Sequence, residues 1–258
     1  MVTPRLAPAP TTLPPDQRVY AVGDIHGCLD RLQSIHAAIA DDLASRPVAD
    51  ALLIHLGDLI DRGPDSARVI AHLMQPFPGH PGVKPPVIRT LMGNHEAMLL
   101  AALANDAPRD SAAHWRQNGG TETLASWNLS WRDPPARWAD AIPPRQLGFL
   151  RGLGLMHRVG GYLFVHAGLR PGVAVARQSR EDLLWIRNPF LDSDARVVPA
   201  DPWQTIPNSL PAVVVHGHTP EPEPVVRANR IGIDTGAVLG GPLTCLVLEG
   251  QSLHFIQA

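Results

Sequence analysis

Five short clusters of metal-binding residue types recur along this chain, and each follows a run of residues typical of a β-strand. The clusters read GDIHG (23–27), GDLIDRG (57–63), GNHE (93–96), VHAG (165–168) and HGHT (216–219), and the runs before them read VYAV, LLIHL, VIRTLM, YLFV and AVVV. Strand ends that meet at one edge of a sheet would bring these Asp, His and Asn side chains together. Such a ligand set is typical of a two-metal hydrolytic site.

The first two clusters supply the carboxylates. The strand period of two predicts that Asp24 and His26 lie on the same side, aimed at a single ion. Asp58 ends the next strand and is placed to bridge two ions. Asp61 and Arg62 follow about one turn further on, where they would work beside the ions rather than bind them.

The other clusters supply neutral ligands. Asn94 offers an amide oxygen and is followed by His95, whereas Glu96 is interpreted as helix-start charge that complements the macrodipole. His166 and His218 each follow a strand of small and branched residues. A single histidine in such a place is more often a hydrogen-bonded core residue. The recurrence of the pattern at five strand ends favours ligands here.

The charges of this ligand set indicate the substrate. Two divalent ions would be only partly neutralised by Asp24 and Asp58, so the site would suit a phosphate ester dianion better than a neutral peptide. Carboxylate, imidazole and amide ligands without thiolate fit manganese, iron or zinc, and the ligand types do not choose among these metals.

The ordered set GDxHG, GDxxDRG, GNHE, HAG and GHT resembles the phosphoprotein phosphatase family of metallophosphoesterases, and most of all its bacterial and phage serine/threonine phosphatases. These motifs run from residue 23 to about residue 236. The resemblance implies two bound divalent ions, expected to be Mn²⁺, with Fe or Zn as alternatives. It assigns the metal ligands Asp24 and His26 to one ion, Asn94, His166 and His218 to the other, and Asp58 to both.

The resemblance also implies a mechanism in which a metal-bridging hydroxide attacks phosphorus directly. His95, oriented by Asp61, would protonate the leaving oxygen, and Arg62 would bind phosphate oxygens. Arg187, two residues after a tryptophan, matches the position of a second phosphate-binding arginine, with a surface arginine as the alternative. His216 is either a substrate contact or a packing residue, since it shares the predicted strand face of His218.

The motifs bear on three functions. The resemblance implies a serine/threonine protein phosphatase acting on phosphoproteins or small phosphate esters. The alternative is a symmetrical bis(5′-nucleosyl)-tetraphosphatase, which shares GDIHGC (23–28). A non-catalytic scaffold is disfavoured because every ligand position is kept. The DTG at 234–236 is also an aspartic protease signature, but only one copy occurs, and the resemblance makes Asp234 a hydrogen-bond partner within the site.

Composition sets further bounds. The chain has 258 residues, 45% hydrophobic and 18% charged, and a net charge of −2, which fits a globular enzyme without the basic surface of a nucleic-acid binder. Cys28 and Cys245 are expected to be thiols rather than a disulfide, in a cytoplasmic protein. No segment is apolar enough over a sufficient length to span a membrane. We expect a monomer.

The elements that must position the site alternate between strand and helix. Strands are predicted at 19–23, 52–57 and 87–92, each followed by a helix, and three such units in succession favour a parallel or mixed sheet. The first helix, over about 29–45, repeats apolar residues every three or four positions, and Asp65 is the candidate N-cap of the second. β-rich segments resume after residue 162. The expected fold is α/β (α+β): a β-sandwich flanked by helices, which the resemblance makes a calcineurin-like metallophosphoesterase fold.

Two segments are expected to stand outside this core. Residues 1–17 are predicted to be a flexible proline-rich tail before a single domain over 18–258. Residues 105–150, with four of the six tryptophans, are predicted to be a helical insertion. It either seals onto the core through those tryptophans or caps the substrate entrance, with NGGTETL (118–124) near the mouth.

Overall fold

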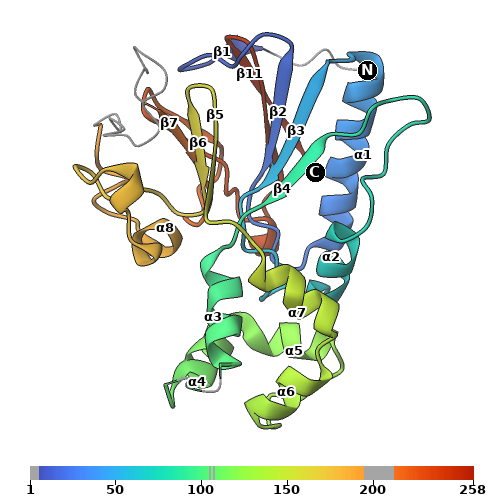
Figure 1. Cartoon of the computed structure of the whole chain (residues 1–258), viewed down its shortest axis with the longest axis vertical. Helices are drawn as coiled ribbons and strands as arrows, with labels where there is room; N and C mark the ends of the chain where they lie inside the picture. Colours follow the sequence, from blue (N-terminus) through green and yellow to red (C-terminus); the bar gives the residue numbers. More distant parts are fainter. Residues whose placement is uncertain (1–5, 105, 107, 195–211) are drawn as a thin grey trace.

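The strands carry apolar side chains on both faces, and they build two sheets that lie face to face with helices on both outer sides (Figure 1). The computed structural model describes residues 6–104, 106, 108–194 and 212–258. The six-stranded sheet has the order β1-β11-β10-β2-β3-β4 and the five-stranded sheet the order β5-β6-β7-β9-β8. The predicted β-sandwich flanked by helices is confirmed.

The strand bounds follow this order. In the first sheet they are Ala7–Pro8 (β1), Ser252–Gln257 (β11), Thr244–Glu249 (β10), Gln17–Val22 (β2), Asp50–His55 (β3) and Val87–Thr90 (β4). In the second sheet they are Met156–Val159 (β5), Tyr162–Val165 (β6), Val213–His216 (β7), Arg230–Gly232 (β9) and Val225–Val226 (β8). Strands β2, β3 and β4 are parallel, as are β6, β7 and β9, so that each sheet presents several carboxyl ends at one edge.

Alternation along each strand divides its side chains between two cores. In β2, Val19 and Ala21 belong to the core between the sheets, whereas Tyr20 and Val22 face the helices. In the second sheet Leu163 of β6 faces outward into a third apolar cluster, which includes residues of α8 (Arg180–Trp185). Each sheet therefore packs against the other sheet through its inner face and against helices through its outer face.

Helices α1 (Leu29–Ser45) and α2 (Ser66–Leu73) cover the outer face of the first sheet. In α1 the buried residues repeat every three or four positions, as the sequence predicts: Leu29, Leu32, Ile35, Ile39 and Leu43. Asp65 occupies the predicted N-cap position of α2 but makes no side-chain cap bond.

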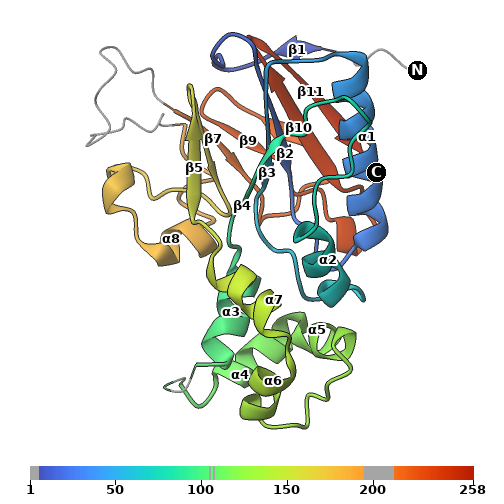
Figure 2. The same ribbon diagram turned by 45° about the vertical axis from the view of Figure 1, so that its right-hand side comes forward.

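A group of helices gathers at the carboxyl-end edge of the first sheet, at the bottom of Figure 2. Its members are α3 (Asn94–Ala102), α4 (Ser111–Trp115), the π-helical turn η1 (Arg116–Gly120), α5 (Thr121–Ser126), α6 (Pro135–Ala141) and α7 (Pro144–Arg151). Trp115 and Trp138 are fully buried and meet edge to face at 5.9 Å, but Trp131 remains 44% exposed. Only part of the tryptophan set thus seals the insertion.

The amino-terminal segment differs from the expected tail. Ala7 and Pro8 pair with β11, and Leu13 lies in the core between the sheets. Residues 9–16 therefore run along the sandwich, and residues 1–5 lie outside the described residues. Within the described part of the chain, no helix combines the length and apolarity needed to cross a membrane.

Candidate active site

The candidate ligands lie beyond the ends of the strands, not on the strands themselves: Asn94 begins α3, and the others lie in loops. Strand β2 ends at Val22 and β7 at His216, before the ligands that each was expected to carry on one face. Left-handed backbone instead aims the side chains: positive φ occurs at His26 (44°) and His218 (66°). The prediction that strand alternation orients these side chains is wrong, because the residues lie outside the paired strands.

Left-handed conformations concentrate at this site. Among the described residues seven non-glycine positions have positive φ, and five of them are candidate site residues: His26, Asp58, Asp61, Arg62 and His218. Each such residue carries strain that surrounding contacts must offset, and clusters of such strain are typical of functional sites.

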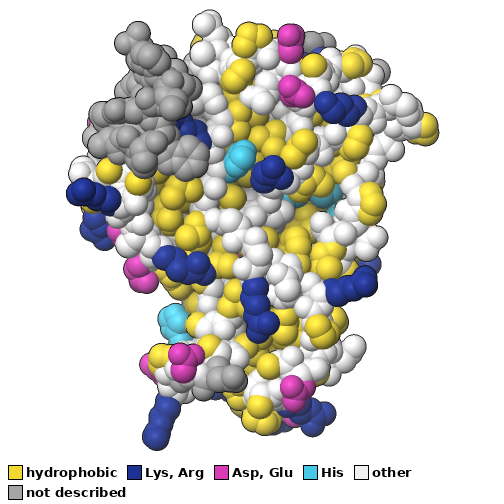
Figure 3. Space-filling view, in the orientation of Figure 1, with side chains coloured by type: hydrophobic (Ala, Val, Ile, Leu, Met, Phe, Trp, Pro, Cys, Tyr) yellow, Lys and Arg dark blue, Asp and Glu magenta, His cyan; other side chains and the backbone are white. Residues whose placement is uncertain are grey.

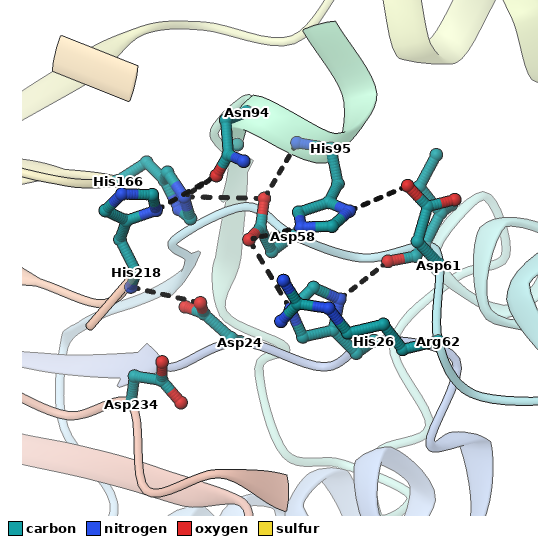
Figure 4. A network of polar contacts seen from close by, with 12 residues as sticks. Asp24, His26, Asp58, Asp61, Arg62, Asn94, His95, His166, His218 and Asp234 are labelled. Atoms are coloured by element: carbon teal, nitrogen blue, oxygen red, sulfur yellow. Dashed lines mark hydrogen bonds and ion pairs between the residues drawn. The ribbon is translucent and has the colours of Figure 1, made fainter. Parts of the chain in front are cut away.

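Asp58 lies at the centre of the cluster (Figure 4). Its Oδ2 is 3.5 Å from His26 Nε2, and its Oδ1 is 3.4 Å from His166 Nε2. The carboxylate packs so closely on the backbone of Gly93 that any side chain there would collide with it. The GNHE glycine is therefore required to let Asp58 sit between the two histidines.

The hydrogen bonds of His26 and His166 set the tautomers of the two rings beside Asp58. His26 Nδ1 lies 2.8 Å from the Ile60 carbonyl and His166 Nδ1 lies 3.1 Å from the Leu56 carbonyl, so both nitrogens must donate. In a neutral ring the Nε2 atoms then carry lone pairs, and both lone pairs face the Asp58 carboxylate. The histidine lone pairs and the carboxylate oxygens are all acceptors, so they repel one another unless positive charge lies between them. This arrangement therefore fits two metal ions.

The second group of ligands surrounds Asn94, at the start of α3. Asn94 Oδ1 lies 2.9 Å from His166 Nε2 and 3.0 Å from His218 Nδ1. The ligand atoms of Asp58, His166 and His218 lie within 4.8 Å of one another, as do those of Asp58, His26 and His95. His218 Nε2 is buried without a hydrogen-bond partner. Neutral imidazole is the form that binds metal, and burial lowers the pKa of His26 and of His218 to about 3.

Asp24 joins the cluster at its edge. Its Oδ2 accepts the His218 backbone N–H at 3.0 Å, and its buried Oδ1 has no partner. Burial, and then the nearby Asp234 and Asp58, raise the pKa of Asp24 well above its usual range. Burial also raises the pKa of Asp234 to about 6. A bound cation would relieve this crowding of carboxylates, so the donor set fits a metal on this side as well.

His95 and Asp61 form a buried pair beside the cluster. His95 Nδ1 lies 2.7 Å from Asp61 Oδ2, and His95 Nε2 lies 3.8 Å from Asp58 Oδ2. Burial lowers the pKa of His95, but Asp58 and Asp61 more than offset this, so the net pKa is raised. His95 Nε2 is directed at the ligand cluster, and both this geometry and the raised pKa are compatible with a general acid.

Two arginines lie beside the candidate ligands. Arg62 is exposed, and its Nη1 donates to His26 Nε2 at 3.0 Å, on the lone pair where a metal would bind. Arg187 is exposed and follows α8, and after burial its charge is among the causes that lower the pKa of His166 and His218. Both positions are compatible with contacts to a phosphate group held by the metals.

His216 is not brought into this cluster. The ring lies edge-on to Phe190 at 5.2 Å, its Nδ1 is 3.1 Å from the Gly217 carbonyl, and it packs on Gly232. The expected shared face with His218 is lost because β7 ends at His216 and His218 turns into left-handed backbone. The structure favours packing over substrate contact for His216.

Sequence reasoning missed the role of Glu96. The carboxylate is fully buried, and it accepts backbone N–H groups of Asp58, Leu59, Ile60 and Gly93 at 2.8 to 3.2 Å. Glu96 thus clamps the loop that carries Asp58 to the start of α3. A glutamate at the third helical position predicts only the Gly93 contact, as half of a capping box.

Comparisons with known proteins agree with this geometry. The family model described as calcineurin-like phosphoesterase matches residues 17–241. Serine/threonine-protein phosphatase 1 of Salmonella typhimurium is 31% identical over 88% of this chain and 90% of its own length. A symmetrical bis(5′-nucleosyl)-tetraphosphatase of Serratia proteamaculans is 28% identical over 92% of this chain and 93% of its own. The crystal structure of a candidate diadenosine tetraphosphatase has the same fold, with a TM-score of 0.61, 24% identity and 98% of each chain covered.

Proposed function

The chain belongs to the calcineurin-like phosphoesterase family, and from this premise we propose that it is a dinuclear-metal phosphomonoesterase acting on phosphoserine and phosphothreonine in proteins. Phosphoester hydrolysis follows from the family. The protein substrate is our proposal, and it is supported by the similarity to a bacterial serine/threonine phosphatase over most of both chains.

The observation that carries the chemistry is the pair of histidine lone pairs that face Asp58 from two sides. We propose that Asp58 bridges two ions, with Asp24 and His26 on one and Asn94, His166 and His218 on the other. The ions, for which Mn²⁺ is our choice, would neutralise phosphate oxygens and supply an activated water.

The protein groups would then act on the phosphate ester directly. Arg62 and Arg187 would bind the non-bridging oxygens, where their charge stabilises the transition state. His95 would donate its Nε2 proton to the leaving oxygen, while Asp61 holds the Nδ1–H and with it the direction of the ring.

A second substrate class is equally supported by similarity. The matched tetraphosphatases cover this chain as fully as the protein phosphatase does, and the same site could hydrolyse a dinucleoside polyphosphate. We favour the phosphoprotein because the charges of Arg62 and Arg187 match a single phosphoryl group. A polyphosphate chain would need a longer row of cationic side chains.

The test uses metal-stripped protein refilled with Mn²⁺ on three substrates: a phosphoserine peptide, a phosphotyrosine peptide and diadenosine tetraphosphate. Fast phosphate release from the phosphoserine peptide supports the proposal. Preferred conversion of the dinucleotide to two ADP molecules would overturn the protein substrate and leave the metal assignments standing. His95→Asn protein, purified in parallel, controls for contaminating phosphatases.

A further inference from the structure

We infer that Trp115 and Thr123 of the helical insertion are positioning residues that hold Asp61, and through it His95, in the geometry needed for proton donation. The inference rests on the proposed function, because it assumes that His95 is the general acid. It gives the insertion a role different from both sealing the core and capping the entrance.

Thr123, on α5, binds Asp61 at two points. Its hydroxyl donates to Asp61 Oδ1 at 2.6 Å and accepts the Asp61 backbone N–H at 2.8 Å. Ser66 Oγ lies 3.0 Å from both the Asp61 nitrogen and the Thr123 hydroxyl, which completes a closed polar group. Thr123, Ser66 and Asp61 are fully buried, so no water competes for these bonds.

Trp115, at the end of α4, binds the other carboxylate oxygen. Its indole Nε1–H donates to Asp61 Oδ2 at 2.8 Å, the same oxygen that accepts His95 Nδ1–H at 2.7 Å. The carboxylate is thus held at both oxygens by the insertion, and its remaining strong contact is with the catalytic imidazole. Trp127, in the same segment, donates its indole N–H instead to Gln146 Oε1 at 2.6 Å.

The same segment also fixes the backbone of Asp61 and Arg62, which have φ of 73° and 68°. The Arg62 N–H donates to the Gly119 carbonyl at 3.1 Å. Gly119 has φ of 102°, and a Cβ there would approach Arg62 Cγ to 2.7 Å. The insertion therefore stabilises a strained pair whose side chains would serve the acid and the phosphate.

This arrangement has a chemical signature that depends on the leaving group. An alkoxide leaving from phosphoserine needs a proton in the transition state, whereas p-nitrophenolate leaves readily without one. Loss of the contacts that hold Asp61 should therefore slow the hydrolysis of substrates with poor leaving groups and have little effect on those with good ones. Loosening Arg62 should weaken phosphate binding for both.

The experiment compares Thr123→Val and Trp115→Phe with two matched controls. Thr123→Ser keeps the hydroxyl, and Trp127→Phe loses an indole N–H that donates to Gln146. We expect kcat on the phosphoserine peptide to fall about 10- to 100-fold in the first two variants. On p-nitrophenyl phosphate it should fall less than about 3-fold, with KM little changed. Both controls should stay close to wild type, whereas Gly119→Ala should raise KM for both substrates.

A second readout needs no metal and no turnover. In metal-free protein the His95 Nδ1–H should give a far-downfield proton resonance, identified by its loss in His95→Asn. We expect Thr123→Val and Trp115→Phe to shift or broaden it and Trp127→Phe to leave it unchanged.

Equal losses on both substrates, or an unchanged resonance in both insertion variants, would overturn the inference. If Asp61→Asn and His95→Asn themselves show no dependence on the leaving group, the proposed acid is wrong, and that result is distinct from a failure of Trp115 and Thr123 alone.

Discussion

At the scale of single residues, Glu96 and Asp58 illustrate two uses of a buried carboxylate. Asp58 faces histidine lone pairs and is suited to metal. Glu96, two residues after Asn94, faces only backbone donors: Oε1 accepts from Leu59 and Ile60, and Oε2 accepts from Asp58 and Gly93. Both oxygens are saturated, so Glu96 has no capacity left for a metal, and its function is to hold the loop.

Glu96→Gln should therefore destabilise the protein although it is nearly isosteric. The amide NH₂ would replace one carboxylate oxygen and, being a donor, could not accept the two backbone N–H groups bound there. The free energy of unfolding should fall by about 2–4 kcal/mol. Denaturant unfolding of the metal-free protein measures it. Glu122→Gln, an exposed position in the first turn of α5, should change stability by less than about 0.5 kcal/mol. Equal stability of both variants would contradict the assigned role.

Asp58→Asn should lose metal from both sites, because under the proposed function the Asp58 carboxylate would hold and neutralise both ions. The metal content measured after dialysis should fall from about two equivalents per chain in wild type to less than about one in this variant. Asp42→Asn provides the control, since Asp42 pairs with Arg18 and Arg46 and not with the ligand cluster. Retention of both ions by the Asp58 variant would rule out bridging.

At the scale of elements, a chain of imidazoles joins two helices to a strand behind the site. His36 of α1 lies 3.0 Å from His72 of α2 through Nδ1 and 3.0 Å from His55 of β3 through Nε2. Thr90 Oγ1 lies 3.4 Å from His55 Nδ1, and Phe77 packs on His36. These contacts fix α1 and α2 against the sheet whose loops carry Asp58.

The imidazole chain predicts a loss of stability in acid. Burial, and then His72, lower the pKa of His36 to about 3, below the value of about 6.5 in an unfolded chain. Between these values the unfolded state binds more protons, so stability is complete above about pH 6.5 and falls as the pH drops towards 3. The lowered pKa of His36 alone should reduce the free energy of unfolding by about 2–3 kcal/mol between pH 7.5 and pH 4.5.

Denaturant unfolding of metal-free wild type, His36→Gln and His80→Gln across this pH range measures the effect. The loss of stability in wild type should exceed that in His36→Gln by this amount. It should match the loss in His80→Gln, because His80 lies on the surface and pairs with Asp41 instead of with the imidazole chain. Parallel pH curves for all three proteins would contradict the prediction.

At the scale of the whole molecule, the candidate ligands come from both sheets. Asp24 and Asp58 follow β2 and β3 of the first sheet, whereas His166 and His218 follow β6 and β7 of the second. Metal ions would therefore join the two halves of the sandwich. On the face shown in Figure 3, lysine and arginine side chains lie scattered among apolar and uncharged surface.

Metal addition should accordingly raise the melting temperature. At about 100 times its Kd, an ion bound only by the folded state stabilises by about 2.7 kcal/mol, or about 5–10 °C for a chain of this size. Calorimetry with Mn²⁺ and with EDTA measures the shift. Asp58→Asn should shift by less than half as much, and an equal shift in that variant would place the stabilising ion elsewhere.

Residue types and their order were enough to identify the family, the ligand candidates and the sandwich with its flanking helices. Each of these depends on local information: a strand pattern, a glycine-flanked cluster, a helical period. The apolar stripe of α1 and the parallel order of β2, β3 and β4 could be read in this way. The resemblance added the assignment of each ligand to an ion.

Only the tertiary structure decided how the site is held. Asp61 and Thr123 are 62 residues apart, and Asp58 and Glu96 are 38 apart. A buried hydrogen bond between such positions depends on where two packed elements meet, and no local pattern encodes that meeting. For the same reason His26 and His218 are aimed by left-handed loops and not by strand alternation: the conformation is strained by itself and persists because distant contacts stabilise it.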